Sequence, residues 1–270
     1  MNLTDTVRVA LEEDLGPLGD ITATLLDAGA RGRGAFVARE VGVLAGAACA
    51  DEAFRQLDPS VFLEWHAHDG DAVKQGQRIA EIDGPLRAIL TGERTALNFL
   101  CHLSGIASLT RRFVDAVAGT GVRVLDTRKT TPGLRELEKA AVRAGGGTNH
   151  RGSLSDMVLV KDNHLAGLSI ADAVGRAREM WPGRGVEVEC DRVEQVREAV
   201  AAGADVVLLD NMSPSEVGVC VKEINGAALA EVSGRVNLGT IVDYAAAGPD
   251  LISVGALTHS APILDIGLDL

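Results

Sequence analysis

Polar residues accompany the apolar runs in the second half of the sequence, and their types suit anion binding and charge stabilisation. Six short apolar runs, at 122–125, 157–160, 186–188, 205–209, 227–232 and 251–254, are typical of strands. The polar residues at or after their ends are Asp126-Thr127-Arg128-Lys129, Lys161-Asp162-Asn163-His164, Glu187 and Glu189, Asp210-Asn211, Glu231 with Ser233-Gly234, and Gly255. A random surface would scatter such residues, so we expect these to gather at one active site.

Two glutamates alternate with valines in the run Val186–Cys190. Side chains alternate along a strand, so Glu187 and Glu189 share one face. If the valines pack against helices, the glutamates point inward, where an unpaired carboxylate is costly to bury. We expect Lys161, after the preceding run, to be their partner. The alternative is a structural ion pair beneath the site.

Two pairs of cations lie beside turn signals. Arg128-Lys129 lies beside the start of a predicted helix, where charge and exposed amides together favour an anion. His150-Arg151 follows three glycines, 145–147, which let the backbone turn sharply. An arginine fork can bind a carboxylate or phosphate with two hydrogen bonds. Solvated or structural charge pairs are the alternatives in both places.

Small residues near the last two runs complete the predicted active site, which contains both positive and negative side chains. Ser233-Gly234 and Gly255 lie where α/β barrels commonly bind phosphate through backbone amides. The cations suit a substrate with several negative charges. The carboxylates suit ribose hydroxyls, a Mg²⁺ ion, or both.

The elements that must position these residues differ between the two parts of the chain. Residues 1–103 contain β-type runs at 34–46 and 61–82, broken by glycine turns, and a helical stretch at 93–103, which indicates an antiparallel sheet with helices. From residue 104 the six apolar runs alternate with helical stretches at 134–144, 170–180, 193–202 and 238–247. This alternation predicts a parallel sheet. Without a G-x-G-x-x-G turn, an incomplete TIM-like α/β barrel over 104–259 fits best.

Composition limits the classes of partner. The chain has 270 residues and a net charge of −12, which argues against a nucleic-acid-binding protein. Residues 123–161 nevertheless carry eight basic and four acidic side chains, so the predicted active site is locally cationic. No window is apolar enough for a membrane span, and the first 15 residues lack a signal-peptide core, so we expect a cytoplasmic protein. The four separated cysteines suggest neither a zinc site nor disulfides.

Several long motifs make the sequence similar to the quinolinate phosphoribosyltransferases. The longest is DTRKTTPGLRELEKAAVRAGGGTNHRGSLSDMVLVKDNHL at 126–165. Others follow in the family's order, namely EDLGPLGDIT (13–22), ERTALNFLCHLSGIAS (93–108), EVEC (187–190), LLDNM (208–212) and VGALTHSAPILDIGLDL (254–270). The resemblance therefore extends almost from end to end.

The resemblance implies an N-terminal α/β sandwich domain over 1–103, onto which the tail 260–270 packs back, and a C-terminal incomplete barrel. It implies a homodimer in which the N-terminal domain closes the partner's barrel. It also implies that quinolinate and phosphoribosyl pyrophosphate react with Mg²⁺ to give nicotinate mononucleotide, pyrophosphate and CO₂, in NAD biosynthesis.

The resemblance also implies roles for individual residues. Carried over by position, these are substrate-binding Arg39, Arg94, Thr127, Arg128, Lys129, His150 and Arg151, catalytic Lys161, Glu189 and Asp210, and phosphate-binding Ser233, Gly234, Gly255 and His259. Glu189 and Asp210 would hold ribose hydroxyls or Mg²⁺, the ion being held mainly by the substrate. Arg94 would reach into the neighbouring subunit's site.

One departure and two rival functions stay open at this point. The phosphate segment of the family usually continues with a second glycine, whereas this chain has Arg235 after Gly234. A related enzyme on the same scaffold could act on nicotinate without decarboxylation. The segment 68–77 resembles a turn of lipoyl- or biotinyl-type carrier domains, but Lys74 precedes the turn and no Met-Lys pair is present.

Overall fold

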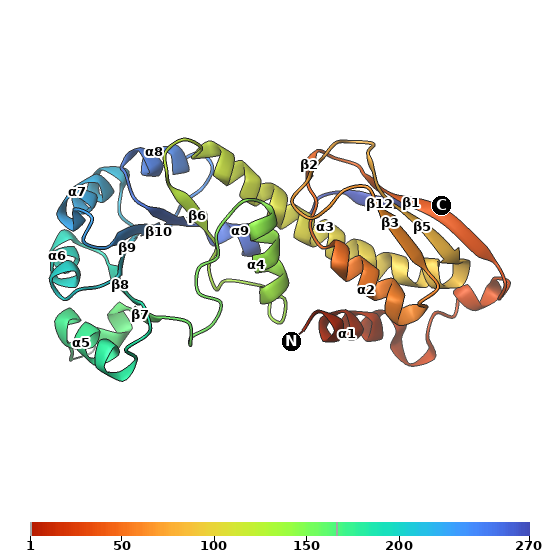
Figure 1. Cartoon of the computed structure of the whole chain (residues 1–270), viewed down its shortest axis with the longest axis horizontal. Helices are drawn as coiled ribbons and strands as arrows, with labels where there is room; N and C mark the ends of the chain where they lie inside the picture. The colour runs from red at the N-terminus through yellow and green to blue at the C-terminus, as the bar shows by residue number, and fades with distance from the viewer. Residues whose placement is uncertain (1, 166) are drawn as a thin grey trace. The chain divides into compact units, whose positions relative to one another are not determined.

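The computed structural model describes residues 2–165 and 167–270, which form two compact units (Figure 1). The first unit contains the chain up to Arg111 together with Thr130–Gly146 and Thr258–Leu270. The second contains Arg112–Lys129 and Gly147–Leu257. The boundary expected after residue 103 lies inside one continuous helix, α3 (Leu86–Ala116). The pattern of apolar residues changes near residue 104, but this change does not coincide with a break in secondary structure.

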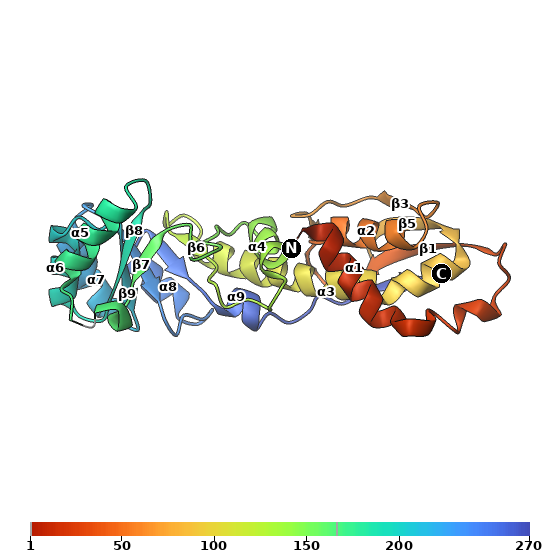
Figure 2. The same cartoon turned by 90° about the horizontal axis from the view of Figure 1, so that it is seen from below.

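The first unit is built on an antiparallel four-stranded sheet. Its order is β12-β1-β5-β3, with β1 at Arg31–Ala38, β3 at Phe62–Trp65, β5 at Arg78–Pro85 and β12 at Ile266–Asp269. A small pair, β2 (Gly42–Val43) and β4 (Ala72–Val73), and the helices α1 (Leu3–Leu15) and α2 (Ala47–Leu57) complete it with α3. Figures 1 and 2 show α2 and α3 on one side of the sheet.

The C-terminal tail is part of this first sheet. Strand β12 pairs with β1 from Ala35↔Asp269 to Ala38↔Ile266. The tail reaches the sheet past α3, and Gly105 makes that approach possible. A Cβ atom at Gly105 would lie 2.1 Å from the carbonyl oxygen of Pro262, which no side chain can tolerate. Position 105 of α3 therefore requires glycine because the tail passes so close to the helix, although glycine is a poor helix former.

The second unit is an open parallel sheet of six strands. Its order is β6-β11-β10-β9-β8-β7, and all five pairings are parallel. The strands are β6 (Arg123–Leu125), β7 (Val158–Val160), β8 (Val186–Cys190), β9 (Val206–Asp210), β10 (Leu229–Ser233) and β11 (Leu251–Ser253). In the described part of the chain β6 and β7 are the two edge strands and do not pair with each other, although Leu125 of β6 forms an isolated parallel bridge with Thr148, and the open sheet confirms the incomplete α/β barrel.

Helices cover the outer side of this sheet (Figure 1). They are α5 (Ile170–Met180), α6 (Val193–Ala201), α7 (Pro214–Ile224) and α8 (Ile241–Ala246). The predicted helices over 170–180, 193–202 and 238–247 are confirmed, whereas α7 was not predicted. The predicted helix over 134–144 is α4 (Arg135–Ala144), and it belongs to the first unit. All four cysteines are free thiols, and no helix in the described residues has the length and apolar character of a membrane span.

Candidate active site

A cavity of about 460 Å³ lies in the second unit at the carboxyl ends of the strands. It gathers most of the residues that the sequence predicted for a site. Its lining consists of Thr127, Arg128, Lys129, His150, Arg151, Leu159, Lys161, Glu189, Leu208, Asp210, Asn211, Glu231, Ser233, Gly234, Arg235 and Ser253. Five arginines and lysines face three carboxylates there, so the cavity is cationic within an acidic protein.

Strand register explains why these side chains converge. Glu189 of β8 pairs with Leu208 of β9, and the same Leu208 pairs with Glu231 of β10. Two residues further along, Asp210 pairs with Ser233. Paired residues in a sheet project to the same face, and every second residue repeats that face. One face of the sheet therefore carries all of these side chains into the cavity.

Lys161 and Glu189 form an ion pair at the end of β7 and β8. The expected partnership of Lys161 is thus present for Glu189. It is absent for Glu187, which lies deeper, is fully buried, and has its Oε2 3.1 Å from Nε2 of His150. The alternation of Val186–Cys190 predicted the shared face of the two glutamates correctly, but not their separate partners.

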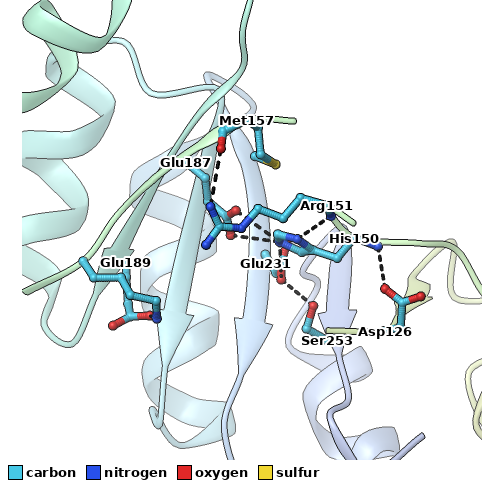
Figure 3. Close-up of polar contacts among 9 residues, drawn as sticks. Asp126, His150, Arg151, Met157, Glu187, Glu189, Glu231 and Ser253 are labelled. Carbon is cyan, nitrogen blue, oxygen red and sulfur yellow. Dashed lines mark hydrogen bonds and ion pairs between the residues drawn. The ribbon is translucent and has the colours of Figure 1, made fainter. Parts of the chain in front are cut away.

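His150 is held between two buried carboxyl groups (Figure 3). Its Nε2 lies 3.1 Å from Glu187 and 3.5 Å from Oε1 of Glu231, and Ser253 donates a 2.5 Å hydrogen bond to that same oxygen. On the other side of the ring, the backbone N–H of Arg151 donates to Nδ1 at 2.7 Å. Both ring nitrogens of His150 are therefore used inside the protein.

The protonation of this cluster follows from that geometry. Burial lowers the pKa of His150, but hydrogen bonds to Glu187 and Glu231 outweigh it and raise the pKa to about 10. The two carboxyl groups therefore favour the protonated, positively charged form of the His150 ring. Burial, together with the nearby Glu231, raises the pKa of Glu187.

Asp126, at the end of β6, anchors the segment that carries His150 and Arg151. Its side chain is fully buried and accepts 2.9 Å and 2.5 Å hydrogen bonds from the backbone of His150 and the side chain of Asn149. Thr148 continues the contact, because its N–H donates to the carbonyl of Val124 at 2.8 Å. A loop that could have been mobile is thereby fixed to the end of a strand.

Arg128 and Arg151 stand close together in the cavity. Burial, and after it the charge of Arg128, lowers the pKa of the Arg151 guanidinium. Nη1 of Arg151 donates only a long 3.4 Å hydrogen bond to the carbonyl of Met157. Two guanidinium groups that repel each other in a partly buried site gain stability when a carboxylate or phosphate binds between them.

Ser233, Gly234 and Arg235 form the corner of the cavity after β10. Gly234 has φ +93°, and a Cβ atom there would lie 2.4 Å from Oδ1 of Asn211. Only glycine fits that position, for both reasons. Arg235 follows with φ +57°, also in the left-handed region.

The carboxylates that fit Mg²⁺ best are Glu189 and Asp210. They lie on neighbouring strands and line the cavity, and Asp210 accepts a 2.6 Å hydrogen bond from the side chain of Asn211. Mg²⁺ favours one or two carboxylates plus substrate phosphates and water. The ligand atoms of His150, Glu187 and Glu231 also lie within 4.8 Å of one another. That deeper trio suits Mg²⁺ less well, because it offers a ring nitrogen and its atoms already contact one another.

Four predicted site residues do not line the cavity. Arg94 lies on α3, and Arg39 forms a 2.5 Å ion pair with Asp269, both in the first unit. His259 also belongs to the first unit, while Gly255 follows β11 in the second. Their roles stay predictions. Conversely, Leu159, Leu208 and Ser253 line the cavity but were not predicted as site residues, although the two-residue alternation along their strands could have identified them.

The first unit has a larger cavity, of about 630 Å³, between α1, α3 and residues 131–134. Its ionisable lining groups are Glu13, Asp14 and His102, so it offers little to an anion. The smaller cavity of the second unit is the better candidate because it combines cations, carboxylates and glycine-rich backbone.

Two family models match most of the chain. The model described as the C-terminal domain of quinolinate phosphoribosyl transferase matches residues 106–269. The model of the N-terminal domain of the same enzyme matches residues 20–104.

Individual relatives agree with the family models. The chain is 44% identical over 260 residues to a probable nicotinate-nucleotide pyrophosphorylase (carboxylating) of Bacillus subtilis, covering 96% of this chain and 90% of that protein. It is also 44% identical to the nicotinate-nucleotide pyrophosphorylase (carboxylating) of Mycobacterium leprae, covering 98% and 96%. The solved structure of the nicotinate-nucleotide pyrophosphorylase from Francisella tularensis matches with a TM-score of 0.96 at 40% identity, covering 99% of this chain and 95% of that one.

Proposed function

Because this chain belongs to the quinolinate phosphoribosyltransferase family, we propose that it converts quinolinate and phosphoribosyl pyrophosphate into nicotinate mononucleotide, pyrophosphate and CO₂. This reaction makes the pyridine nucleotide that NAD biosynthesis needs. The observation that carries the proposal is the cavity at the carboxyl ends of the strands, where Arg128 and Arg151 lie together with two lysines and with carboxylates.

Quinolinate carries two carboxylates on adjacent ring carbons, which suits these two arginines. Each guanidinium offers a planar fork that can hold a carboxylate through two hydrogen bonds. Lys129 and Lys161 add two further cations to the lining, and Lys161 would approach both the acid and the phosphoribosyl donor. Held in this way, the ring nitrogen can be aimed at the anomeric carbon of the donor, which lowers the entropic barrier to reaction.

The transfer step forms a bond between the ring nitrogen and the anomeric carbon and breaks the bond from that carbon to pyrophosphate. Positive charge grows on the ribose as pyrophosphate leaves. Glu189 and Asp210, which line the cavity, are suited to stabilise it. Lys161 is suited to neutralise the leaving group once an anionic substrate separates it from Glu189.

Mg²⁺ is proposed as the cofactor, with Glu189 and Asp210 as its protein ligands and the substrate as its main source of oxygens. When bound, the ion would offset charge on the pyrophosphate group.

Decarboxylation follows from the charge that transfer creates. The ring nitrogen of the intermediate is cationic, so breaking the bond from the adjacent carbon to its carboxylate leaves an electron pair that this charge stabilises. CO₂ departs and the carbon takes up a proton. The protein then needs only to bind that carboxylate less tightly in the transition state than in the ground state.

A homodimer is also proposed, with Arg94 contributing to the partner's site and with Arg39, Gly255 and His259 near the donor phosphates. Mixing Arg94→Ala and Lys161→Ala proteins tests the shared site. If the sites are shared, heterodimers contain one site free of both substitutions and recover part of the activity. No recovery in mixed dimers would contradict the role of Arg94 across the interface.

Release of CO₂ and pyrophosphate tests the proposed reaction directly. The protein is incubated with Mg²⁺, phosphoribosyl pyrophosphate and either quinolinate or nicotinate. Both products from quinolinate, with little pyrophosphate from nicotinate, are expected. Pyrophosphate from nicotinate alone would assign the chain to the non-decarboxylating reaction instead. Arg128→Ala serves as the matched variant and is expected to remain folded while losing most of kcat/KM for quinolinate.

A further inference from the structure

Arg235 has a backbone conformation that its residue type disfavours. Among the described residues, the non-glycine positions with positive φ are Asn211, Asn225 and Arg235. Asparagine tolerates the left-handed region because its short side chain can hydrogen-bond locally, whereas a long side chain such as arginine gains no such compensation. Glycine would adopt φ +57° without strain. The conformation therefore costs stability that a glycine at 235 would restore.

The side chain of Arg235 is also without an internal partner. Within residues 2–165 and 167–270, its guanidinium makes no hydrogen bond or ion pair, and only its carbonyl is used, by Asn237 at 3.5 Å. By contrast, Arg39, Arg178 and Arg197 each contact a carboxylate. Arg235 is exposed and is one of the residues that line the cavity, so its side chain is available to a ligand there.

The alternative is that Arg235 is simply a solvated surface residue. A solvated arginine can occupy any ordinary surface position, so solvation gives no reason for this residue at a strained corner. Gly234 already supplies the turn, since Asn211 leaves no space for a side chain at 234. Strain that persists next to a site is a reason to look for a function of the residue that bears it.

We propose that Arg235 is a substrate-binding residue whose guanidinium holds the phosphate monoester of the phosphoribosyl donor. The proposal rests on the function proposed above, because it assigns one group of that donor. The hydroxyl of Ser233 and the backbone amides around Gly234 lie beside Arg235 at the same corner and suit the same group. A guanidinium fork matches the paired oxygens of a phosphate better than an ammonium does.

Arg235→Gly tests two properties of this residue, the charge of its guanidinium and the strain of its backbone. The substitution removes the charge and relieves the backbone. We expect KM for phosphoribosyl pyrophosphate to rise about tenfold or more, because a charge-assisted contact is lost. KM for quinolinate and kcat stay within about twofold of the wild type, since the reacting groups are unchanged. The urea midpoint of unfolding rises, because strain is removed.

Two further variants serve as controls. Asn225→Gly relieves a left-handed residue at the end of α7, outside the cavity, so it should change neither KM. Arg235→Lys keeps the charge without the fork and should give a KM between those of the wild type and Arg235→Gly. An unchanged KM for phosphoribosyl pyrophosphate in Arg235→Gly, or a lower urea midpoint, would overturn the proposal.

Equilibrium binding identifies which phosphate is held. Ribose 5-phosphate and pyrophosphate are titrated separately into the wild type and Arg235→Gly by calorimetry. Weaker binding of ribose 5-phosphate alone supports the proposal. Loss confined to pyrophosphate, or no loss of either, refutes it. If the wild type fails to release CO₂ from quinolinate while ribose 5-phosphate binding still depends on Arg235, the proposed reaction fails and the phosphate site stands.

Discussion

Replacing His150 with alanine should destabilise the second unit more than any typical surface substitution. The side chains of His150, Glu187 and Glu231 are 10%, 0% and 2% exposed, and the imidazole lies 3.1 Å and 3.5 Å from the two carboxyl groups. The variant leaves those carboxyl groups facing each other without the imidazole N–H. Removing one partner of a buried charged cluster costs about 3–5 kcal/mol. For a protein of this size that lowers Tm by about 6–20 °C.

The pH dependence of this loss has a definite sign. The pKa of Glu187 is raised in the folded protein, so its stabilising contribution is complete at low pH and is lost as pH rises through the folded-state pKa. The pKa of His150 is raised as well, to about 10, so its stabilising contribution is complete below the unfolded-state pKa of about 6.5 and is lost as pH rises toward 10. Because His150→Ala removes this contribution, the difference in unfolding free energy between the wild type and the variant should be larger at pH 5 than at pH 8.

Urea unfolding followed by circular dichroism at both pH values provides the measurement. His150→Ala/Glu187→Gln is the rescue variant, since it removes the charge that the first substitution left unpaired, and most of the lost stability should return. Glu187→Gln alone keeps an acceptor for Nε2 and should cost about 1 kcal/mol. A loss below about 1 kcal/mol in His150→Ala at pH 5, or a double variant no more stable than the single one, would refute the reasoning.

Three further predictions concern catalysis, acid stability and the passage of the C-terminal tail. Lys161→Ala should lower kcat/KM at least about 100-fold in a CO₂-release assay while its circular dichroism spectrum is kept, because Glu189 loses only an exchangeable partner; near-normal turnover would contradict the assigned role. Hydrogen bonds from Arg55 lower the pKa of Glu52 to about 2, so its contribution is present above the unfolded pKa and lost as pH falls toward 2. Glu52→Gln should thus cost about 1–2 kcal/mol at pH 7, discounted because Arg55 is exposed, and little near pH 3 in urea titrations; an equal loss at both pH values would exclude this ion pair as the cause. Gly105→Ala should destabilise by about 3 kcal/mol in the same assay, because its Cβ would meet a backbone carbonyl at 2.1 Å, and an unchanged midpoint would show that the tail can move aside.

Much of the barrel could be predicted because its signals are local. Each of the six strands is a short apolar run, and polar residues stand at the same end of each. Helix α7 was missed although Ser213 and Glu216 form a capping box around Pro214, which is a readable start signal. The pairing of β12 with β1 joins residues more than 200 positions apart. No local pattern specifies such a pairing, so only the resemblance suggested it.

The limits of prediction within the site have a similar cause. The alternation of residues along the strand predicted that Glu187 and Glu189 share one face. It could not predict that Glu187 is more deeply buried than Glu189. The fully buried Glu187 meets His150, which arrives on a loop whose course Asp126 determines from a different strand. A sequence pattern gives the direction of a side chain on its own element, whereas its partner depends on how distant elements meet.

The internal ion pairs of the cavity explain how a cationic site can exist in a protein with a net charge of −12. Lys161 contacts Glu189, and His150 contacts the carboxyl pair below it, so these groups are partly neutralised before any ligand arrives. The positive charge of Arg128 lowers the pKa of Arg151, so a negative charge bound near both would relieve this repulsion. In the proposed mechanism, a phosphorylated donor would draw Lys161 away from Glu189 and leave that carboxylate beside the ribose, where positive charge would develop. The carboxylates of the cavity would then balance charge in the free protein and become available to the reaction when substrate binds.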